Sequence, residues 1–468
     1  MVKGVWFMKK IIANGIVVFP DETLPCDLLI ENGKIAAIGK DLCRDGAEVI
    51  DAAGKCVLPG AVDVHTHMDL DVGIARAVDN FYDGTVAAAC GGTTTIVDHL
   101  AFGPKDCALR HQIDEYHQLA DGKAVIDYGF HGVLQHVDEQ VLADMGTLFH
   151  EGYTSFKVYM TYDNKLNDAE IFQVLKRAKE LGMVIPVHAE NDGVVNYLRA
   201  WYKAQGLCTP AYHPKSRPDG TEAEAVSRIL HLAAMAGDAP VYIVHLSTRK
   251  GLKEIQKARA GGQKNIIVET CPQYLTLTDE KYQDEQEGLK YIMSPPLRKK
   301  EDNEALWKAT ADGDIQVIAT DHCPFTFKTQ KQRGAGDFTA CPNGAPGVEE
   351  RVPLLFSEGV LKNRISVNKF VELLCENPAK AYGLYPQKGT LLPGSDADVL
   401  LIDPAKERTL TIGDLHGACD YCTYEGMKLQ GNIEMVFSHG DLIVKDNRFL
   451  GKKGAGRFLK RGKSLLID

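Results

Sequence analysis

Long apolar runs are missing from this sequence, and basic residues are in the minority. No apolar stretch is long enough to cross a bilayer, and the opening MVKGVWFMKK lacks the apolar core and small-residue cleavage site of a secretory signal. The 53 Lys and Arg stand against 63 Asp and Glu. The resulting net charge of −10 argues against non-specific nucleic-acid binding. We therefore expect a soluble cytoplasmic protein.

A disulfide framework is also not expected. The twelve cysteines are scattered through segments that are typical of strands or helices, which suits reduced thiols in a cytoplasm. Cys419 and Cys422 form a CxxC pair without a second pair to complete a metal site. Two free thiols are the prediction there.

Strand-like and helix-like stretches alternate through the middle of the chain. Segments 168–181, 221–236 and 250–260 have helical periodicity, and they separate short runs of β-branched and apolar residues. The eight runs are GAVDVHTH from Gly60, TTTIVDHL from Thr93, AVIDYGFHGV from Ala124, SFKVYM from Ser155, MVIPVHAE from Met183, PVYIVHLS from Pro240, NIIVETCP from Asn265 and IQVIATDH from Ile315. Strand then helix, repeated eight times, predicts an α/β fold of the (β/α)8 TIM-barrel type.

The two ends of the chain have a different pattern. The pattern of residues 9–58 predicts short strands with tight turns at Asn14-Gly15 and Asn32-Gly33. After residue 385, strand patterns return in GSDADVLLID and IEMVFSHGDLIV. Neither end alone offers enough strands to bury a face. The prediction is one small β-sandwich domain, built from 1–58 and 386–468 with a C-terminal tail, beside a barrel over 59–385. Two separate β appendages are the alternative.

Metal-capable side chains stand at the ends of the predicted barrel strands, where barrel enzymes place their active sites. His65 and His67 close the first strand, and side chains two apart on a strand point the same way. Two imidazoles on one face suit zinc, manganese or another borderline metal.

Lys157 lies inside the apolar run SFKVYM, where a buried ammonium would be costly. An edge position, with the amine reaching solvent, is one interpretation. In the other, burial lowers the pKa of Lys157, and the neutral amine captures carbon dioxide as a carbamate. That carboxylate on a long arm could bridge two metals.

Three further strands end in residues that could complete such a centre. His188, His245 and Asp321 would each be weak candidates alone, because a single histidine at a strand end is more often structural. Together with the first-strand pair and Lys157 they predict a site for two divalent ions, which can activate a bridging water and polarise a carbonyl. Asp321 would accept the proton of that water and pass it to the leaving nitrogen.

Long motifs along nearly the whole chain resemble the hydantoinase/dihydropyrimidinase branch of the amidohydrolase superfamily, and within it the bacterial D-hydantoinases. The motifs are VDVHTHMD, GGTTTIVD, FKVYMTY, VHAEN, YIVHLS, ETCPQYL, SPPLR, ATDHCPF and PNGAPGVE, with GSDADVLLID and DYCTYEGM in the terminal sandwich. The resemblance implies hydrolytic ring opening of 5-substituted hydantoins, such as phenylhydantoin, or of dihydropyrimidines, to N-carbamoyl amino acids. It implies two divalent ions, with zinc preferred over manganese, cobalt or nickel.

The resemblance also assigns residues. The metal ligands would be His65, His67, a carboxylated and bridging Lys157, His188, His245 and Asp321. Tyr162 would donate a hydrogen bond to the developing oxyanion, and the backbone groups of Ser294 and Asn343 would hold the cyclic amide. The ring substituent would lie against Val72, Tyr159 and Leu166. His322 and Cys323 are interpreted as supporting or loop residues.

Other functions known for similar sequences fit this chain less well. Dihydroorotases and allantoinases carry an arginine two residues after HxH, where this chain has Asp69. Non-enzymatic relatives of the dihydropyrimidinases have lost most metal ligands, whereas all six positions are filled here. The basic stretch 452–463 could contact nucleic acid, but a solvated tail or a subunit contact is the better prediction. A homotetramer is expected from the resemblance.

Overall fold

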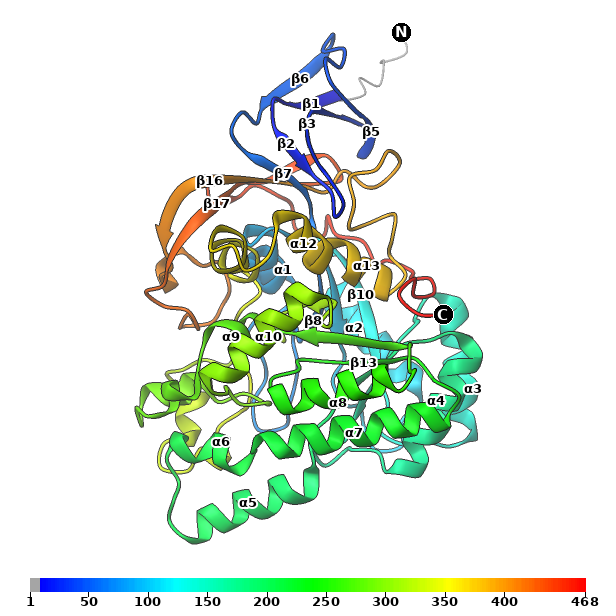
Figure 1. Ribbon diagram of the computed structural model, residues 1–468, viewed down its shortest axis with the longest axis vertical. Helices are drawn as coiled ribbons and strands as arrows, with labels where there is room; N and C mark the ends of the chain where they lie inside the picture. Colours follow the sequence, from blue (N-terminus) through cyan, green and yellow to red (C-terminus); the bar gives the residue numbers. More distant parts are fainter. Residues whose placement is uncertain (1–8) are drawn as a thin grey trace.

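The computed structural model describes residues 9–468 (Figure 1). Part of the predicted absence of a secretory signal rests on residues 1–8, which lie outside the described residues. No helix between Lys9 and Asp468 has the length and apolar character needed to cross a membrane. All twelve cysteines are free, and Cys419 and Cys422 are both buried.

A parallel sheet of eight strands in chain order forms the centre of the larger part of the molecule. The strands are β8 (Ala61–Thr66), β9 (Thr93–His99), β10 (Asp127–Val133), β11 (Phe156–Tyr159), β12 (Ile185–His188), β13 (Val241–Ile243), β14 (Ile266–Thr270) and β15 (Val317–Ile318). An isolated parallel bridge between Thr66 and His322 joins the segment after β15 to β8. Each predicted run contains one of these strands, so the eight-stranded barrel is confirmed.

Helices cover the outer face of this sheet (Figure 1). The longer ones are α1 (Phe81–Cys90), α2 (Leu109–Ala120), α3 (Glu139–Glu151), α4 (Asp168–Leu181), α5 (Asp192–Ala204), α7 (Asp219–Met235), α8 (Arg249–Ala260) and α10 (Lys300–Asp312). The shorter ones are α6 (His213–Ser216), α9 (Pro272–Thr276), α11 (Arg351–Leu355), α12 (Val367–Val371) and α13 (Asn377–Ala381). The helices α4, α7 and α8 match the three predicted segments to within two residues.

The bounds of α4 follow from local chemistry. Asn167 and Glu170 form a capping box at its start, which satisfies backbone N–H groups that have no partner within the helix. Gly182 takes the left-handed conformation that ends it, with φ 72°. The buried residues recur on one face of the helix, which packs on the barrel: Ile171, Val174, Leu175 and Ala178.

Strands from both ends of the chain share one sheet. Its seven strands, in spatial order, are β19 (Arg448–Phe449), β18 (Asp441–Lys445), β17 (Lys428–Ser438), β16 (Val399–Thr409), β7 (Cys56–Pro59), β2 (Ile16–Val18) and β3 (Thr23–Pro25). A four-stranded sheet is ordered β5 (Lys34–Gly39), β4 (Asp27–Glu31), β1 (Lys9–Ala13) and β6 (Ala47–Asp51). Figure 1 shows both sheets together at one end of the molecule.

The two terminal sheets share a hydrophobic core. Ile12 and Val17 from the N-terminal side pack in the same buried cluster as Val399 and Phe437 from the C-terminal side. We therefore propose the composite domain of 1–58 and 386–468 in preference to two separate appendages.

The basic tail lies against the barrel of its own chain. Tyr128 of β10 forms a parallel bridge with Phe458. Arg461 is only 5% exposed, and its Nη1 donates to Ser155 Oγ at 2.9 Å. The prediction of a solvated tail is therefore wrong for Arg461, because its guanidinium satisfies polar groups at the bottom of the barrel.

Candidate metal centre and active site

The six predicted metal ligands come together at one end of the barrel. His65 and His67 lie at the end of β8, and Lys157 lies on β11. His188, His245 and Asp321 come from the ends of later strands. All six side chains line a single cavity of about 770 Å³.

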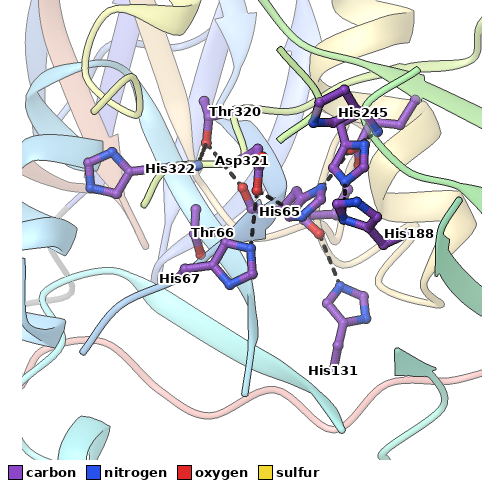
Figure 2. A network of polar contacts seen from close by, with 12 residues as sticks. His65, Thr66, His67, His131, His188, His245, Thr320, Asp321 and His322 are labelled. Carbon is purple, nitrogen blue, oxygen red and sulfur yellow. Dashed lines mark hydrogen bonds and ion pairs between the residues drawn. The ribbon is translucent and has the colours of Figure 1, made fainter. Parts of the chain in front are cut away.

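Two of the histidines converge on one carboxylate oxygen. The Nε2 atoms of His65 and His67 each lie 3.1 Å from Oδ1 of Asp321 (Figure 2). The ligand atoms of these three residues are close enough together to hold one metal ion. Two imidazole nitrogens and a carboxylate oxygen are a donor set that zinc and similar ions accept.

A second pair of imidazoles faces the same cavity. His188 Nδ1 and His245 Nε2 are 3.0 Å apart (Figure 2). Both rings are buried, with 3% exposure each. Two imidazole nitrogens aimed at each other in a buried site fit a cation placed between them. The donor chemistry of these four imidazoles and one carboxylate therefore fits a pair of divalent ions.

Burial keeps most of these imidazoles neutral, which is the form that binds metal. It lowers the pKa of His67 to about 4, and it also lowers the pKa values of His188 and His245. His65 differs, because the carboxylates of Glu269 and Asp321 outweigh burial and raise its pKa to about 8.

Glu269 orients His65, and the sequence interpretation did not assign it a role. Its Oε1 accepts from His65 Nδ1 at 2.6 Å and from the His245 backbone N–H at 2.9 Å, while Oε2 accepts from the Tyr242 hydroxyl at 2.7 Å. With Nδ1 engaged, the Nε2 of His65 is left to face Asp321. The carboxylate within the apolar run NIIVETCP was the signal that could have found it.

Lys157 is enclosed by the barrel. It is 2% exposed, so the interpretation as an edge residue with a solvated amine is wrong. Burial lowers the pKa of Lys157 to about 8, although the carboxylates of Asp321 and Glu269 oppose this change. A fraction of the amine is therefore neutral near pH 7 and able to act as a nucleophile.

The residues predicted to contact substrate lie in the same cavity. Tyr162, Ser294 and Asn343 all line it. The Ser294 hydroxyl is buried and has no hydrogen-bond partner within residues 9–468. A backbone hydrogen bond from Gly344 to Ile292, 3.0 Å long, holds the loops of Asn343 and Ser294 beside each other.

Three residues of this site have a strained backbone conformation. Tyr162, His245 and Asp321 have positive φ angles of 74°, 40° and 55°. L-residues rarely adopt this conformation, and it persists where the surrounding structure enforces it, often at functional sites.

The predicted substituent pocket is partly corrected. Val72 and Tyr159 line the cavity. Leu166 is 4% exposed and packs in the barrel core, and it is not part of the cavity wall in the described structure. The wall instead includes Ile74 and Phe102, which the sequence interpretation missed.

Three further residues beside the predicted ligands have different positions. His322 Nε2 contacts Asp79 Oδ2 at 2.9 Å, which agrees with a supporting role, whereas Cys323 lines the cavity. The Asp69 carboxylate accepts from the backbone N–H of Phe81 at 3.2 Å, so it holds the start of α1.

Comparisons with known proteins identify the family of this chain. The model of the amidohydrolase family matches residues 56–443. The chain is 50% identical over 455 residues to a D-phenylhydantoinase of Escherichia coli, covering 97% of this chain and 98% of that one. The structure is similar to that of a dihydropyrimidinase from Brevibacillus agri, with a TM-score of 0.95 and 45% identity over 98% of this chain and 99% of that one. An L-hydantoinase from Arthrobacter aurescens matches with a TM-score of 0.87 and 31% identity over 97% of this chain and 100% of that one. The chain therefore belongs to the amidohydrolase family, in its branch of hydantoinases and dihydropyrimidinases.

Proposed function

We propose that this protein hydrolyses the ring amide of 5-substituted hydantoins, such as phenylhydantoin, and of dihydropyrimidines, to give N-carbamoyl amino acids. The observation that carries the proposal is the convergence of six metal-capable residues from five barrel strands on one cavity. The same cavity contains Tyr162 and Ser294 as candidate partners for an amide.

We propose that two divalent ions occupy this centre, with zinc preferred and manganese, cobalt or nickel as alternatives. Their ligands would be His65, His67, Lys157, His188, His245 and Asp321. When bound, the ions would polarise the amide carbonyl and lower the pKa of water. The neutral amine of Lys157 would add to carbon dioxide and lose a proton, which leaves a carboxylate able to contact both ions.

The side chains divide the proton transfer and charge stabilisation between them. Asp321 accepts a proton from the attacking water. The carbonyl carbon gains the water oxygen, the ring C–N bond breaks, and Asp321 returns the proton to the leaving nitrogen. Tyr162 donates a hydrogen bond to the oxyanion that forms. Burial raises the pKa of Tyr162 to about 12, so its hydroxyl keeps the proton that it must donate.

The cavity wall supports a bulky apolar substituent. Val72 and Ile74 are 41% and 50% exposed, and they lie on the wall with Tyr159 and Phe102. Such exposed apolar groups would lose water contact when a phenyl or alkyl substituent binds. Ser294 and Asn343 would hold the cyclic amide through their backbone groups.

The test is hydrolysis of both phenylhydantoin enantiomers and of dihydrouracil, with metal content measured on the same sample. Two metals per chain and chelator-sensitive turnover are expected, and mass spectrometry after labelled bicarbonate would report the Lys157 carbamate. A metal-loaded protein that opens none of these rings would contradict the proposed substrate class. Protein that takes up no metal would contradict the proposed centre.

We propose a cytoplasmic location, because twelve free thiols suit a reducing compartment. We also propose a homotetramer, by similarity to the family. Light scattering of the purified protein tests the oligomeric state, and a monomer would contradict it.

A further inference from the structure

A layer of buried charged residues lies behind the His188 side of the cavity. Glu190, Arg217, Glu222 and Arg298 are 0%, 1%, 2% and 5% exposed. Charged groups this deeply buried are costly unless they are paired. The proposed reaction uses none of the four, so their contacts need an explanation.

Glu190 determines which nitrogen of His188 faces the cavity. Its Oε2 lies 2.8 Å from His188 Nε2 and 2.5 Å from Arg217 Nη1. Because a carboxylate oxygen only accepts, His188 Nε2 must carry the proton. The other nitrogen, Nδ1, is then the acceptor atom that points toward His245 Nε2.

Arg217 contacts the proposed oxyanion donor. Its guanidinium carbon lies 5.8 Å from the centre of the Tyr162 ring, and both residues line the cavity. A guanidinium is planar, so it can lie against an aromatic face while its N–H groups bind a carboxylate. Arg217 thereby connects Tyr162 to Glu190.

The layer of buried charged residues extends to the segment that follows β13. Arg298 donates from Nε to Ser247 Oγ at 3.1 Å and from Nη1 to the backbone oxygen of Arg217 at 2.5 Å. Glu222 accepts from the backbone N–H of Ser247 at 2.9 Å. Ser247 follows His245 by two residues, so the same layer fixes the backbone just after the other histidine of this pair.

We propose that Glu190 and Arg217 are positioning residues that act as one unit, a buried ion pair that aligns His188 for metal and Tyr162 for substrate. The inference rests on the proposed function. It predicts that breaking the pair weakens one metal site and the turnover step together, although neither residue touches the reacting atoms.

The experiment compares Arg217→Gln, Glu190→Gln and the double variant, using metal-free protein titrated with zinc alone and steady-state kinetics. Each single variant should bind one of two zinc equivalents about 10- to 100-fold more weakly. The kcat should fall more than KM rises. The double variant should lose no more than either single variant, because the two residues act as one unit.

Arg217→Lys separates the two roles. Lysine retains a positive charge for Glu190, so zinc affinity should recover, but it has no planar face for Tyr162, so kcat should stay low. The matched control is Arg259→Gln. Arg259 Nη2 donates a hydrogen bond to the backbone oxygen of Ile266 at 2.9 Å. Ile266 begins β14, at the end of the barrel opposite the cavity. Its loss should leave both zinc sites and kcat unchanged.

Folded Arg217→Gln with two wild-type zinc affinities and unchanged kcat would overturn the inference, as would additive losses in the double variant. If Arg217→Gln does not fold, Glu190→Gln and Arg217→Lys carry the same comparison. An unaltered protein that binds no zinc would instead overturn the proposed function, and the inference with it.

Discussion

Replacing Lys157 by methionine should stabilise the metal-free protein while it destroys the metal centre. Burial lowers the pKa of Lys157 from 10.5 to about 8. At ~1.4 kcal/mol per pH unit this corresponds to roughly 3 kcal/mol against the charged amine at pH 7. Methionine has a similar shape and no charge, so that cost should disappear.

The pH dependence has a definite sign. The folded-state pKa of Lys157 lies below its unfolded value, so the unfolded chain binds more protons between pH 8 and 10.5. The free energy of unfolding of the wild type therefore rises across that window, and the advantage of Lys157→Met shrinks there. For a chain of 468 residues, roughly 3 kcal/mol corresponds to a rise of roughly 3 °C in Tm at pH 7.

The assay is thermal unfolding of both proteins after chelation and removal of bicarbonate, over pH 7 to 10.5, with metal content and turnover measured on reconstituted samples. The matched control is Lys331→Met. Lys331 is also fully buried, but it donates to Ile292 O and Pro342 O at 2.7 and 2.9 Å. Leaving two buried carbonyls unpaired costs about 1–3 kcal/mol each, so no stabilisation is expected.

Two results would refute the reasoning. A metal-free Lys157→Met protein that is no more stable than the wild type at pH 7 would show that the lysine carries no desolvation cost. A reconstituted variant with two metals and substantial turnover would show that Lys157 does not join the ions.

Three further predictions concern the proton path, the oxyanion donor and the domain contact. Asp321→Asn should lower kcat by about 10²- to 10⁴-fold in a steady-state assay; near-normal kcat would remove it from the proton path. Tyr162→Phe should lower kcat by about 10²- to 10³-fold with metal content unchanged, and lost metal would assign the tyrosine a structural role instead. Although burial opposes it, hydrogen bonds to Asp127 and Asp396 raise the pKa of His439 to about 9. The stability from His439 is therefore fully present below pH 6.5 and lost as the pH rises through about 9, so His439→Gln should flatten the fall in Tm between these values. Parallel melting curves would contradict it.

The barrel strands could be predicted because their signal is local. A buried parallel strand is a short apolar run between helical stretches, and the eight runs each contain one observed strand. The pairing of His65 with His67 could also be predicted locally, because side chains two residues apart on a strand point to the same face. Lys157 stood out because a lysine inside such a run needs a compensating environment.

The supporting contacts could not be predicted in this way. Glu269 contacts His65 across 204 residues of sequence, and Arg217 reaches Glu190 across 27. No periodicity links such pairs, because the contacts depend on how neighbouring strands and loops are placed. For the same reason the sequence could not show that Leu166 packs in the core instead of lining the cavity, or that Arg461 is buried.

The sequence by itself determined the order of strands and helices, the residue types at the strand ends and the family to which the chain belongs. These depend on local hydrophobic pattern and on side-chain chemistry, both of which are read along the chain. Only the tertiary structure decided which imidazole nitrogen faces the cavity, that Lys157 is enclosed and that an ion pair stands behind His188. Those properties arise from desolvation and from hydrogen-bond geometry, which exist only after distant segments have packed together.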